Sequence, residues 1–552
     1  MRFLLEWAPA VLAALLAWKA GAGRFRFDPP GWVRAALARP KLTAAGLTLA
    51  LCALLSAVNP AAPAVHDEYA YLLAGETFAA GRLTNPTPRG WEHFESFHTL
   101  LTPSYQAKYP PAQALFLAAG IALTGSPIVG VWLSMALAAA ALAWMLQRWV
   151  EPGWALLGGL LPVLRFGSLG NWNGLEWAWW SATYWGGAVA MLGGALTLGG
   201  ARRLAEEARP RDGLLLGLGL AILANARPYE GLVAAGVAGL ALLIDGARRQ
   251  RAGRLALALG PCAAVLTAAG CGMAVYNQAV TGDPWRMPYQ EYARQYEVNP
   301  SFTLLEPKED PPAFRHEVMR RYAEEFQLGS YLRAKGGRAI TSEDLTLHAS
   351  FFLGPALLPA LLLGMAELRR FWAATAFAML AATFAAHWIV ATSHFFPHYL
   401  APGIPGLLTV TVLGWRRLAR WSPRGRAVGA AAAGGLALAC VAAFALSAAL
   451  RYRHLQGWTG VPGARSQIER MLRQAPGRDL IFVRYEPDHF LHDEWVYNGA
   501  DFDQRPVLWT RSMGEEADRR LLEIYQGRKA WLFEPDAQRN VLRRYAPDGD
   551  EE

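Results

Sequence analysis

Long blocks of apolar residues recur along the first 450 positions of the chain, and polar connections separate them. The hydrocarbon core of a bilayer is about 30 Å thick, so a helix needs roughly 20 apolar residues to cross it. The pattern predicts membrane-spanning helices over 42–58, 177–199, 213–224, 230–244, 255–276, 350–364, 371–391, 400–414 and 427–450, with further apolar blocks at 112–124, 127–147 and 153–165. The shorter blocks must borrow flanking residues, tilt, or stop short of a full crossing.

Five connections between these blocks are rich in lysine and arginine, and together they carry a net charge of +15. They lie at 19–41, 201–212, 245–254, 367–370 and 416–426. Cytoplasmic loops are enriched in Lys and Arg, and all five connections can be placed on the cytoplasmic side at once. The segments 59–111, 277–349 and 451–552 then face outward.

In this orientation Pro111 and Glu176 lie on the same side of the membrane, so only an even number of crossings fits between them. Three apolar blocks lie there, however. We expect one of them to stay in the interface or to form a half-helix, and 112–124 is the candidate. The first 18 residues are also apolar, and we interpret them as a membrane segment and not as a removed signal peptide.

The composition agrees with a membrane protein. Hydrophobic residues make up 53% of the chain and charged residues 18%, whereas a soluble domain carries about 25% charged residues. The formal net charge of +9 follows from the basic connections, so it indicates topology and not a nucleic-acid partner. All four cysteines lie in apolar segments, in no pattern typical of a zinc site or a disulfide framework.

The first outward segment opens with HDEYAY, which contains His66, Asp67 and Glu68. Adjacent carboxylates near a membrane surface suit general-base work or the binding of a divalent cation, because partial desolvation raises carboxylate basicity. The same residues also suit the first turn of a helix, where acidic side chains interact favourably with the helix dipole.

The same segment ends in KYPPAQ, where Lys108 and Tyr109 precede two prolines. A lysine at headgroup depth can meet a lipid phosphate as a compact charge, or it can simply extend its ammonium toward water. Between the two ends, GWEHFESFHT contains His93 and His98. Their spacing is not that of a helical zinc site, and we expect a polar loop surface there.

Further ionisable residues lie near the predicted outer ends of spans. Glu176 stands among five tryptophans, and an ionisable residue at membrane depth is a functional candidate. NARPYEG places Arg227, Tyr229 and Glu230 at an outward break. Arg227 could bind a phosphate through two hydrogen bonds, or pair with Glu230.

Two histidines, His394 and His398, lie four residues apart near the outer end of another span. Pro397 breaks the helix that would align them on one face. We therefore expect them to bind a polar headgroup or a sugar by hydrogen bonds, and not a metal ion.

The tail 451–552 has the pattern of a small α/β domain. Strands are predicted over 478–485, 505–510 and 529–536, and a helix over 514–526. The tail contains no GxGxxG or GKS/T phosphate loop. Its acidic and histidine-rich turn is expected to be a solvated loop; this turn contains Asp488, His489, His492, Asp493 and Glu494.

The order of these features resembles the GT-C superfamily of polytopic membrane glycosyltransferases, such as protein O-mannosyltransferases and the lipid A aminoarabinose transferase family. The likeness rests on the Asp-Glu pair at 67–68, on Lys108 before two prolines, and on the topology. It implies a mainly α bundle of about 11 to 13 transmembrane helices over 1–450, followed by an extracytoplasmic α/β domain over 451–552.

The resemblance also implies an inverting transfer of a sugar from a polyprenyl-phosphate donor to a lipid, glycan or protein acceptor. Asp67, with Glu68 beside it, would be the base or acceptor-binding group, and Glu176 maps less securely onto a second acid. Lys108 would contact the donor phosphate, with Arg227 as a second cation. The further candidates for substrate binding are Tyr109, Tyr229, Glu230, His394 and His398.

No cofactor is required by this reading, and no metal site is assigned. The nearby histidines permit a divalent cation, whereas Lys108 and Arg227 could replace one. The expected location is the bacterial cytoplasmic membrane, with the active site and the tail on the outer, periplasmic side. The alternative function is a transporter or flippase of a lipid-linked sugar, in which intramembrane charges would line a path.

Overall fold

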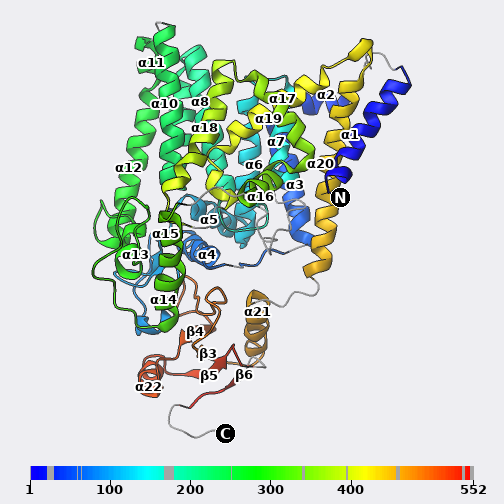
Figure 1. The fold of residues 1–552 in the computed structure, drawn as a ribbon. Coiled ribbons are helices and arrows are strands. Elements are labelled where there is room, and N and C mark those ends of the chain that lie inside the picture. Colours follow the sequence, from blue (N-terminus) through cyan, green and yellow to red (C-terminus); the bar gives the residue numbers. More distant parts are fainter. Residues whose placement is uncertain are drawn as a thin grey trace.

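The computed structural model shows a helical bundle with a small mixed domain below it (Figure 1). The structure describes residues 2–21, 30–58, 60–63, 65–166, 180–249, 252–337, 342–392, 396–455, 461–537 and 541–546. The predicted fold class, a polytopic helical bundle followed by a small α/β tail, is confirmed.

Within these residues, six helical stretches of 18 to 29 residues are apolar and long enough to cross a membrane. They are formed by α3 (Pro40–Val58), α6 (Pro127–Leu146), α10 (Pro228–Arg248), α11 with α12 (Ala252–Ala258 and Gly260–Thr281), α18 with η5 (Phe371–Ala386 and His387–Ile389) and α20 (Val428–Leu455). Two further helices, α16 (Ser342–Phe352) and α17 (Gly354–Gly364), pass the same test together but are bent by 96°. They form a broken span or a re-entrant loop.

Other helices complete the bundle between these spans. They are α1 (Arg2–Lys19), α2 (Gly31–Ala38), α5 (Ala112–Thr124), α7 (Pro152–Arg165), α8 (Gly187–Glu207), α9 (Pro210–Ala224) and α19 (Ile404–Ala419). Short turns η4 (Met365–Glu367), η5 (His387–Ile389), η6 (Pro397–Leu400) and η7 (Pro423–Gly425) lie at helix ends. Helix α1 packs along α20 and α17, and its buried Glu6 forms an ion pair of 3.1 Å with buried Arg165.

Helix α5 is the short apolar block expected to stop short of a crossing. Its 13 residues span about 20 Å at 1.5 Å per residue, less than the bilayer core. It packs closely against α6, and glycine at position 130 makes this possible. A Cβ added to Gly130 would lie 1.9 Å from the carbonyl oxygen of Phe116.

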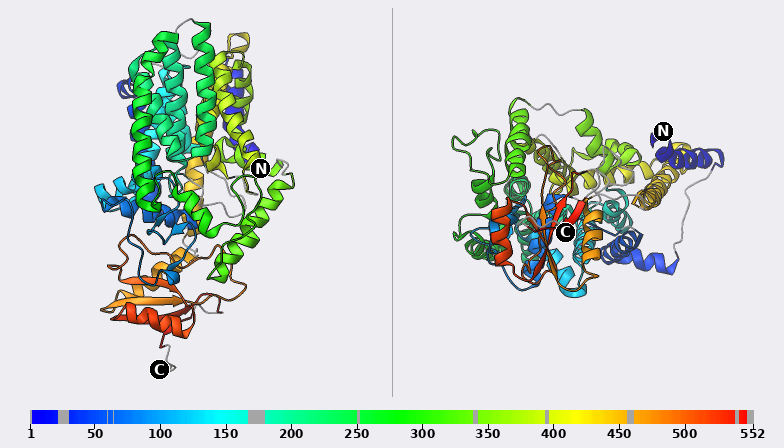
Figure 2. Two further views of the ribbon diagram at one scale, coloured as in Figure 1. Left: turned by 90° about the vertical axis from the view of Figure 1, so that its left-hand side faces the viewer. Right: turned by 90° about the horizontal axis from the view of Figure 1, so that it is seen from below.

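The segments predicted to face outward form a layer between the bundle and the tail (Figures 1 and 2). The first contains α4 (His66–Ala79), the turn η1 (Trp91–Phe94) and the antiparallel pair β1 (Thr99–Leu100) and β2 (Gln106–Ala107). The second contains α13 (Pro288–Tyr296), α14 (Glu317–Arg321), the π-helical segment η3 (Tyr322–Gln327) and α15 (Leu328–Lys335). Helices α2 and α11, near predicted cytoplasmic connections, lie at the opposite end of the bundle (Figure 1).

The tail is a four-stranded sheet with two helices. It contains α21 (Val461–Leu472), β3 (Arg478–Val483), β4 (Val507–Arg511), α22 (Glu515–Ile524), β5 (Arg528–Glu534) and β6 (Val541–Arg544). The strand order is β4-β3-β5-β6, in which β3 is parallel to β4 and β5, and β6 is antiparallel to β5. The three predicted strands and the predicted helix over 514–526 are confirmed, whereas β6 and α21 were not predicted.

The tail and the first outward segment share an apolar core. Leu73, Phe94 and Leu101 pack in one cluster with Phe482 and Leu521 of the tail. At this contact Gly90 has a φ of +67°, and a Cβ there would lie 2.4 Å from Cδ1 of Leu521. The tail is therefore fixed directly against the segment that begins with Asp67.

Candidate active site

The acidic pair lies in the first turn of α4, where the helix dipole favours carboxylates. Glu68 is buried, and its Oε1 accepts a hydrogen bond of 2.8 Å from the backbone N–H of Tyr184. The side chain of Asp67, in contrast, is 36% exposed. Asp67 is therefore the carboxylate that a substrate can reach, while Glu68 holds the chain that leads into α8.

Asp67 is held by a tyrosine from the other end of the same outward segment. The hydroxyl of Tyr109 donates a hydrogen bond to Oδ1 of Asp67, and the Tyr109 ring stacks on Tyr71 at 4.6 Å. Burial, with the nearby Asp67 charge, raises the pKa of Tyr109 well above its ordinary value. The phenol thus stays protonated and acts as a donor to the carboxylate.

Lys108 is buried and does not extend toward water. Its Nζ lies 3.2 Å from Oε1 of Glu297, in an ion pair whose two side chains are 3% and 8% exposed. The ammonium also lies 4.4 Å from the ring centre of Tyr292 and 4.7 Å from that of Tyr289. Lys108 therefore sits in an aromatic cage with a carboxylate already beside it.

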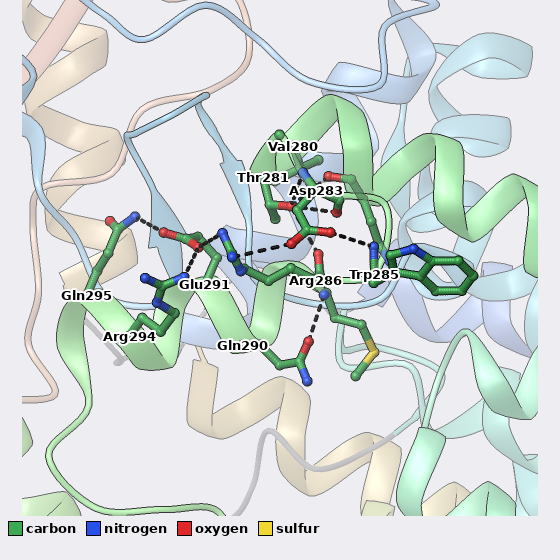
Figure 3. Close-up of polar contacts among 12 residues, drawn as sticks. Val280, Thr281, Asp283, Trp285, Arg286, Gln290, Glu291, Arg294 and Gln295 are labelled. Atoms are coloured by element: carbon green, nitrogen blue, oxygen red, sulfur yellow. Dashed lines mark hydrogen bonds and ion pairs between the residues drawn. The ribbon is translucent and has the colours of Figure 1, made fainter. Parts of the chain in front are cut away.

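The aromatic cage is positioned by the connection between α12 and α13 (Figure 3). Arg286 contacts both Asp283 and Glu291 at 3.3 Å, and Gln295 donates hydrogen bonds to Glu291 and to the carbonyl of Thr102. This network fixes α13 against the first outward segment. Trp285 points away from it and is exposed.

Arg227 precedes α10 and is tied to the same region through the backbone. The N–H of Ala112 donates a hydrogen bond of 2.9 Å to the carbonyl of Asn225. The Arg227 guanidinium lies 4.9 Å from the ring centre of Tyr399. Among the described residues, no carboxylate lies within ion-pair distance of Arg227. Burial lowers its pKa, but nearby charges, that of Glu230 first, raise the pKa by more.

Asp67 and Arg227 act on the same aromatic side chains. Burial raises the pKa of Tyr71, the Arg227 charge opposes this rise, and the Asp67 charge adds to it. Burial also raises the pKa of Tyr289; here too the Arg227 charge opposes the rise and the Asp67 charge adds to it. The structure thus brings Asp67, Tyr109, the Lys108 cage and Arg227 to one aromatic cluster.

Three other predicted residues surround this cluster less directly. Buried Glu230 follows Tyr229, whose hydroxyl donates a hydrogen bond of 2.8 Å to the carbonyl of Ala386. His398 is buried against Trp185 at 4.7 Å, and burial together with the Arg227 charge lowers its pKa. The remaining two candidates, Glu176 and His394, lie outside the described residues.

The tail contributes side chains that the sequence did not predict. His66 contacts the hydroxyl of Tyr497 at 2.8 Å and Nδ1 of His492 at 3.2 Å. The prediction of a solvated loop holds for Asp488, His492 and Asp493, which are exposed. It was wrong for His489 and Glu494, which are buried, the latter in an ion pair with Arg511. The density of histidine and tyrosine in HFLHDEWVY was a signal for a packed site.

The prediction of a polar loop surface around His93 and His98 was also wrong. His93, Glu95 and His98 are all buried beneath the tail and the second outward segment. His93 contacts the carbonyl of Arg511 at 2.9 Å, and Glu95 accepts a hydrogen bond from Tyr296. Across the described ranges, no group of three or more His, Cys, Asp and Glu side chains is arranged to hold a metal ion.

The fold is similar to those of two solved membrane proteins. ArnT from Cupriavidus metallidurans bound to undecaprenyl phosphate aligns over 91% of this chain and 93% of its own, with a TM-score of 0.53 and 14% identity. The oligosaccharyltransferase of Archaeoglobus fulgidus in its apo form aligns over 89% of this chain and 69% of its own, with a TM-score of 0.51 and 10% identity.

No family model and no curated protein matches the chain in sequence. The likeness to the solved structures extends over most of the chain and concerns the fold. The chain therefore shares the fold of these two proteins, which agrees with the fold expected from its motifs and topology.

Proposed function

We propose that the protein is an inverting glycosyltransferase that uses a polyprenyl-phosphate sugar donor. The observation that carries this proposal is that a partly exposed carboxylate, Asp67, and a cation without an ion-pair partner among the described residues, Arg227, lie around one aromatic cluster. A base and a cation at one site are the two groups that sugar transfer from a phosphate requires.

In this reaction Asp67 takes the proton of an acceptor hydroxyl as the oxygen attacks the anomeric carbon. The bond between that carbon and the donor phosphate breaks, and its electron pair leaves with the phosphate oxygen. Attack from the side opposite the phosphate inverts the anomeric centre. Tyr109 keeps Asp67 oriented, and Arg227 neutralises the charge that develops on the departing lipid phosphate.

Lys108 is the second proposed phosphate contact. In the present structure its ammonium is neutralised by Glu297, so a phosphate would have to approach beside or in place of that carboxylate. Arg227, which has no such partner among the described side chains, is the better supported cation. One of the proteins with this fold, ArnT, binds undecaprenyl phosphate.

The proposed acceptor is a hydroxyl of a lipid, glycan or protein, on the outer face of the bacterial cytoplasmic membrane. The basic connections support this side, because cytoplasmic loops are enriched in Lys and Arg, and the proposed topology then leaves 59–111, 277–349 and 451–552 outside. The aromatic surroundings of the site, including Tyr71, Tyr289 and Tyr399, suit packing against the faces of sugar rings. No described group of side chains supports a divalent cation.

The proposal can be tested with purified protein in lipid nanodiscs. A panel of undecaprenyl-phosphate hexoses and pentoses is incubated with outer-leaflet lipid, glycan and peptide acceptors, and mass spectrometry measures free undecaprenyl phosphate and glycosylated acceptor. We expect turnover of one donor, its loss in Asp67→Asn, and its retention in the matched control Asp310→Asn, which changes an exposed loop carboxylate. Turnover that persists unchanged in Asp67→Asn contradicts the proposal.

A further inference from the structure

His98 has an unusual backbone conformation beneath the candidate active site. Its φ is +63°, in the left-handed region that non-glycine residues seldom adopt. The residue is 5% exposed, so no solvent contact accounts for this conformation. Strained backbone persists where the surroundings enforce it, and such positions concentrate at functional sites.

Two backbone hydrogen bonds enforce the conformation, and both lead to the lysine cage. The carbonyl of His98 accepts the N–H of Lys108 at 3.0 Å, and its own N–H donates to the hydroxyl oxygen of Tyr292 at 3.0 Å. Tyr292 is the ring closest to the Lys108 ammonium. The position of His98 is therefore coupled to that of Lys108 through the peptide groups on both sides of its α-carbon.

The imidazole of His98 points toward the proposed base. Its Nε2 lies 3.8 Å from Oδ2 of Asp67 and 3.4 Å from the hydroxyl of Tyr322. Tyr109 holds the other oxygen of the same carboxylate, Oδ1. Tyr109 thus binds one oxygen of Asp67, and the His98 imidazole lies near the other.

The imidazole is neutral and has one N–H to place. Burial, with the Lys108 and His492 charges, lowers the pKa of His98 well below its ordinary value. Nδ1 has no hydrogen-bond partner among the described residues, whereas Nε2 faces the Asp67 carboxylate. A proton on Nε2 is the tautomer that satisfies this geometry, because a carboxylate only accepts.

We propose that His98 is a positioning residue for the transfer reaction. Its Nε2–H holds Oδ2 of Asp67, and its strained backbone keeps this carboxylate at a fixed position relative to Lys108. The inference rests on the proposed function. Tyr109 and His98 together would fix the plane of the carboxylate and direct its remaining lone pairs to the acceptor hydroxyl. The long Nε2–Oδ2 distance would shorten when substrates fill the site, as is usual for catalytic hydrogen bonds.

Two substitutions distinguish the effect of the imidazole ring from the effect of the backbone conformation at position 98. His98→Asn retains a residue type that tolerates positive φ, but its amide is too short to reach the position of Nε2. His98→Gln can place an amide N–H where Nε2–H lies, although glutamine is less suited to this backbone. A positioning role and a purely structural role therefore predict opposite orders of activity.

The experiment measures kcat, donor KM and melting temperature of both variants with the undecaprenyl-phosphate sugar that the wild type turns over. We expect His98→Asn to melt at or above the temperature of His98→Gln, yet to have a kcat about 100-fold below wild type and about tenfold below the Gln variant. Donor KM should stay within about twofold in both variants, because the lost contact orients the base and does not bind the donor.

Activities that follow the melting temperatures, with the Asn variant equal to or faster than the Gln variant, would overturn the inference. If His98→Gln does not fold, His98→Gly provides the second measurement, because glycine adopts this φ freely. Added imidazole should then raise its kcat several-fold, and wild-type kcat in the Gly variant without imidazole would overturn the inference. A wild type that transfers no sugar instead refutes the proposed function itself.

Discussion

The hydroxyl of Tyr109 donates a hydrogen bond to the carboxylate of Asp67, 42 residues earlier in the chain. These residues stand at the two ends of the first outward segment, so the fold closes that segment into a loop at its base. The tail packs against this loop, and the helix α5 that follows Tyr109 packs against α4. The proposed base is thus held by the closure of its own loop.

Removing the Tyr109 hydroxyl should slow catalysis more than it affects folding. In Tyr109→Phe the ring still stacks on Tyr71, but Asp67 loses one of its donors. A lost hydrogen bond to a charged group corresponds to roughly 1.5–3 kcal/mol, so we expect kcat to fall by about 10- to 100-fold. The control is Tyr331→Phe, which removes a buried hydroxyl bonded to Leu305. Steady-state kinetics in which the two variants behave alike would contradict the role of Tyr109.

Arg227 should determine donor affinity. In Arg227→Gln the cluster loses the cation that has no ion partner in the described structure. We expect the Kd for undecaprenyl phosphate, measured by native mass spectrometry, to rise by about tenfold or more, which corresponds to at least about 1.4 kcal/mol. Arg294→Gln serves as the matched control, because Arg294 is 63% exposed on α13. Equal Kd values for the wild type and Arg227→Gln would exclude the phosphate contact.

A buried ion pair should control the docking of the tail. Arg511 donates to Glu494 at 2.6 Å within the tail and to the carbonyl of Glu95 at 2.8 Å across the contact. In Arg511→Met the buried Glu494 is left without its cation, which costs about 3–5 kcal/mol. Urea unfolding followed by tryptophan fluorescence should show this loss. Adding Glu494→Gln should recover part of it, and a double variant less stable than Arg511→Met would contradict the pairing argument.

The contact between the outward segments and the tail should weaken in acid. Burial, with the Arg511 charge, lowers the pKa of His316 from 6.5 to about 3. The folded state therefore binds this proton less readily than the unfolded state, and stability is lost as pH falls below 6.5. At pH 5 the loss is about 2 kcal/mol for this residue.

The comparison that isolates His316 is the difference in melting temperature between pH 7.5 and pH 5, for the wild type and for His316→Gln. We expect the Gln variant to have the smaller difference. Part of the pH dependence should remain, because burial also lowers the pKa values of His66 and His98. Burial raises the pKa of Glu95, so the folded state binds this proton more readily than the unfolded state, and Glu95 adds stability as pH falls. An unchanged pH dependence in His316→Gln would refute the assignment.

The features that depend on local pattern could be predicted from the sequence. The apolar blocks predicted the helical bundle, and the basic connections predicted its orientation, because the bilayer imposes length and sidedness on each helix independently. The strands of the tail followed from runs such as RDLIFV, which are buried in β3. The start of α4 at the Asp-Glu pair agrees with the dipole preference of acidic residues.

The features that depend on distant packing could not be predicted in this way. The partner of Lys108 is Glu297, 189 residues later, and that of His66 is Tyr497, 431 residues later. Polar residues such as His93 and His489 were predicted to be exposed, because a buried polar side chain needs hydrogen-bond partners, and these partners lie elsewhere in the chain. The left-handed backbone of His98 likewise follows from tertiary hydrogen bonds, not from its neighbours.

The central claim, that Asp67 is the base of an inverting sugar transfer, is tested most directly by single-turnover kinetics with stereochemical analysis. Wild type and Asp67→Asn are saturated with the same undecaprenyl-phosphate sugar and acceptor, and NMR gives the anomeric configuration of the product. We predict a product of inverted configuration, and a transfer rate at least about 10²- to 10⁴-fold lower in Asp67→Asn. A retained configuration, or a wild-type rate in Asp67→Asn, would contradict the claim.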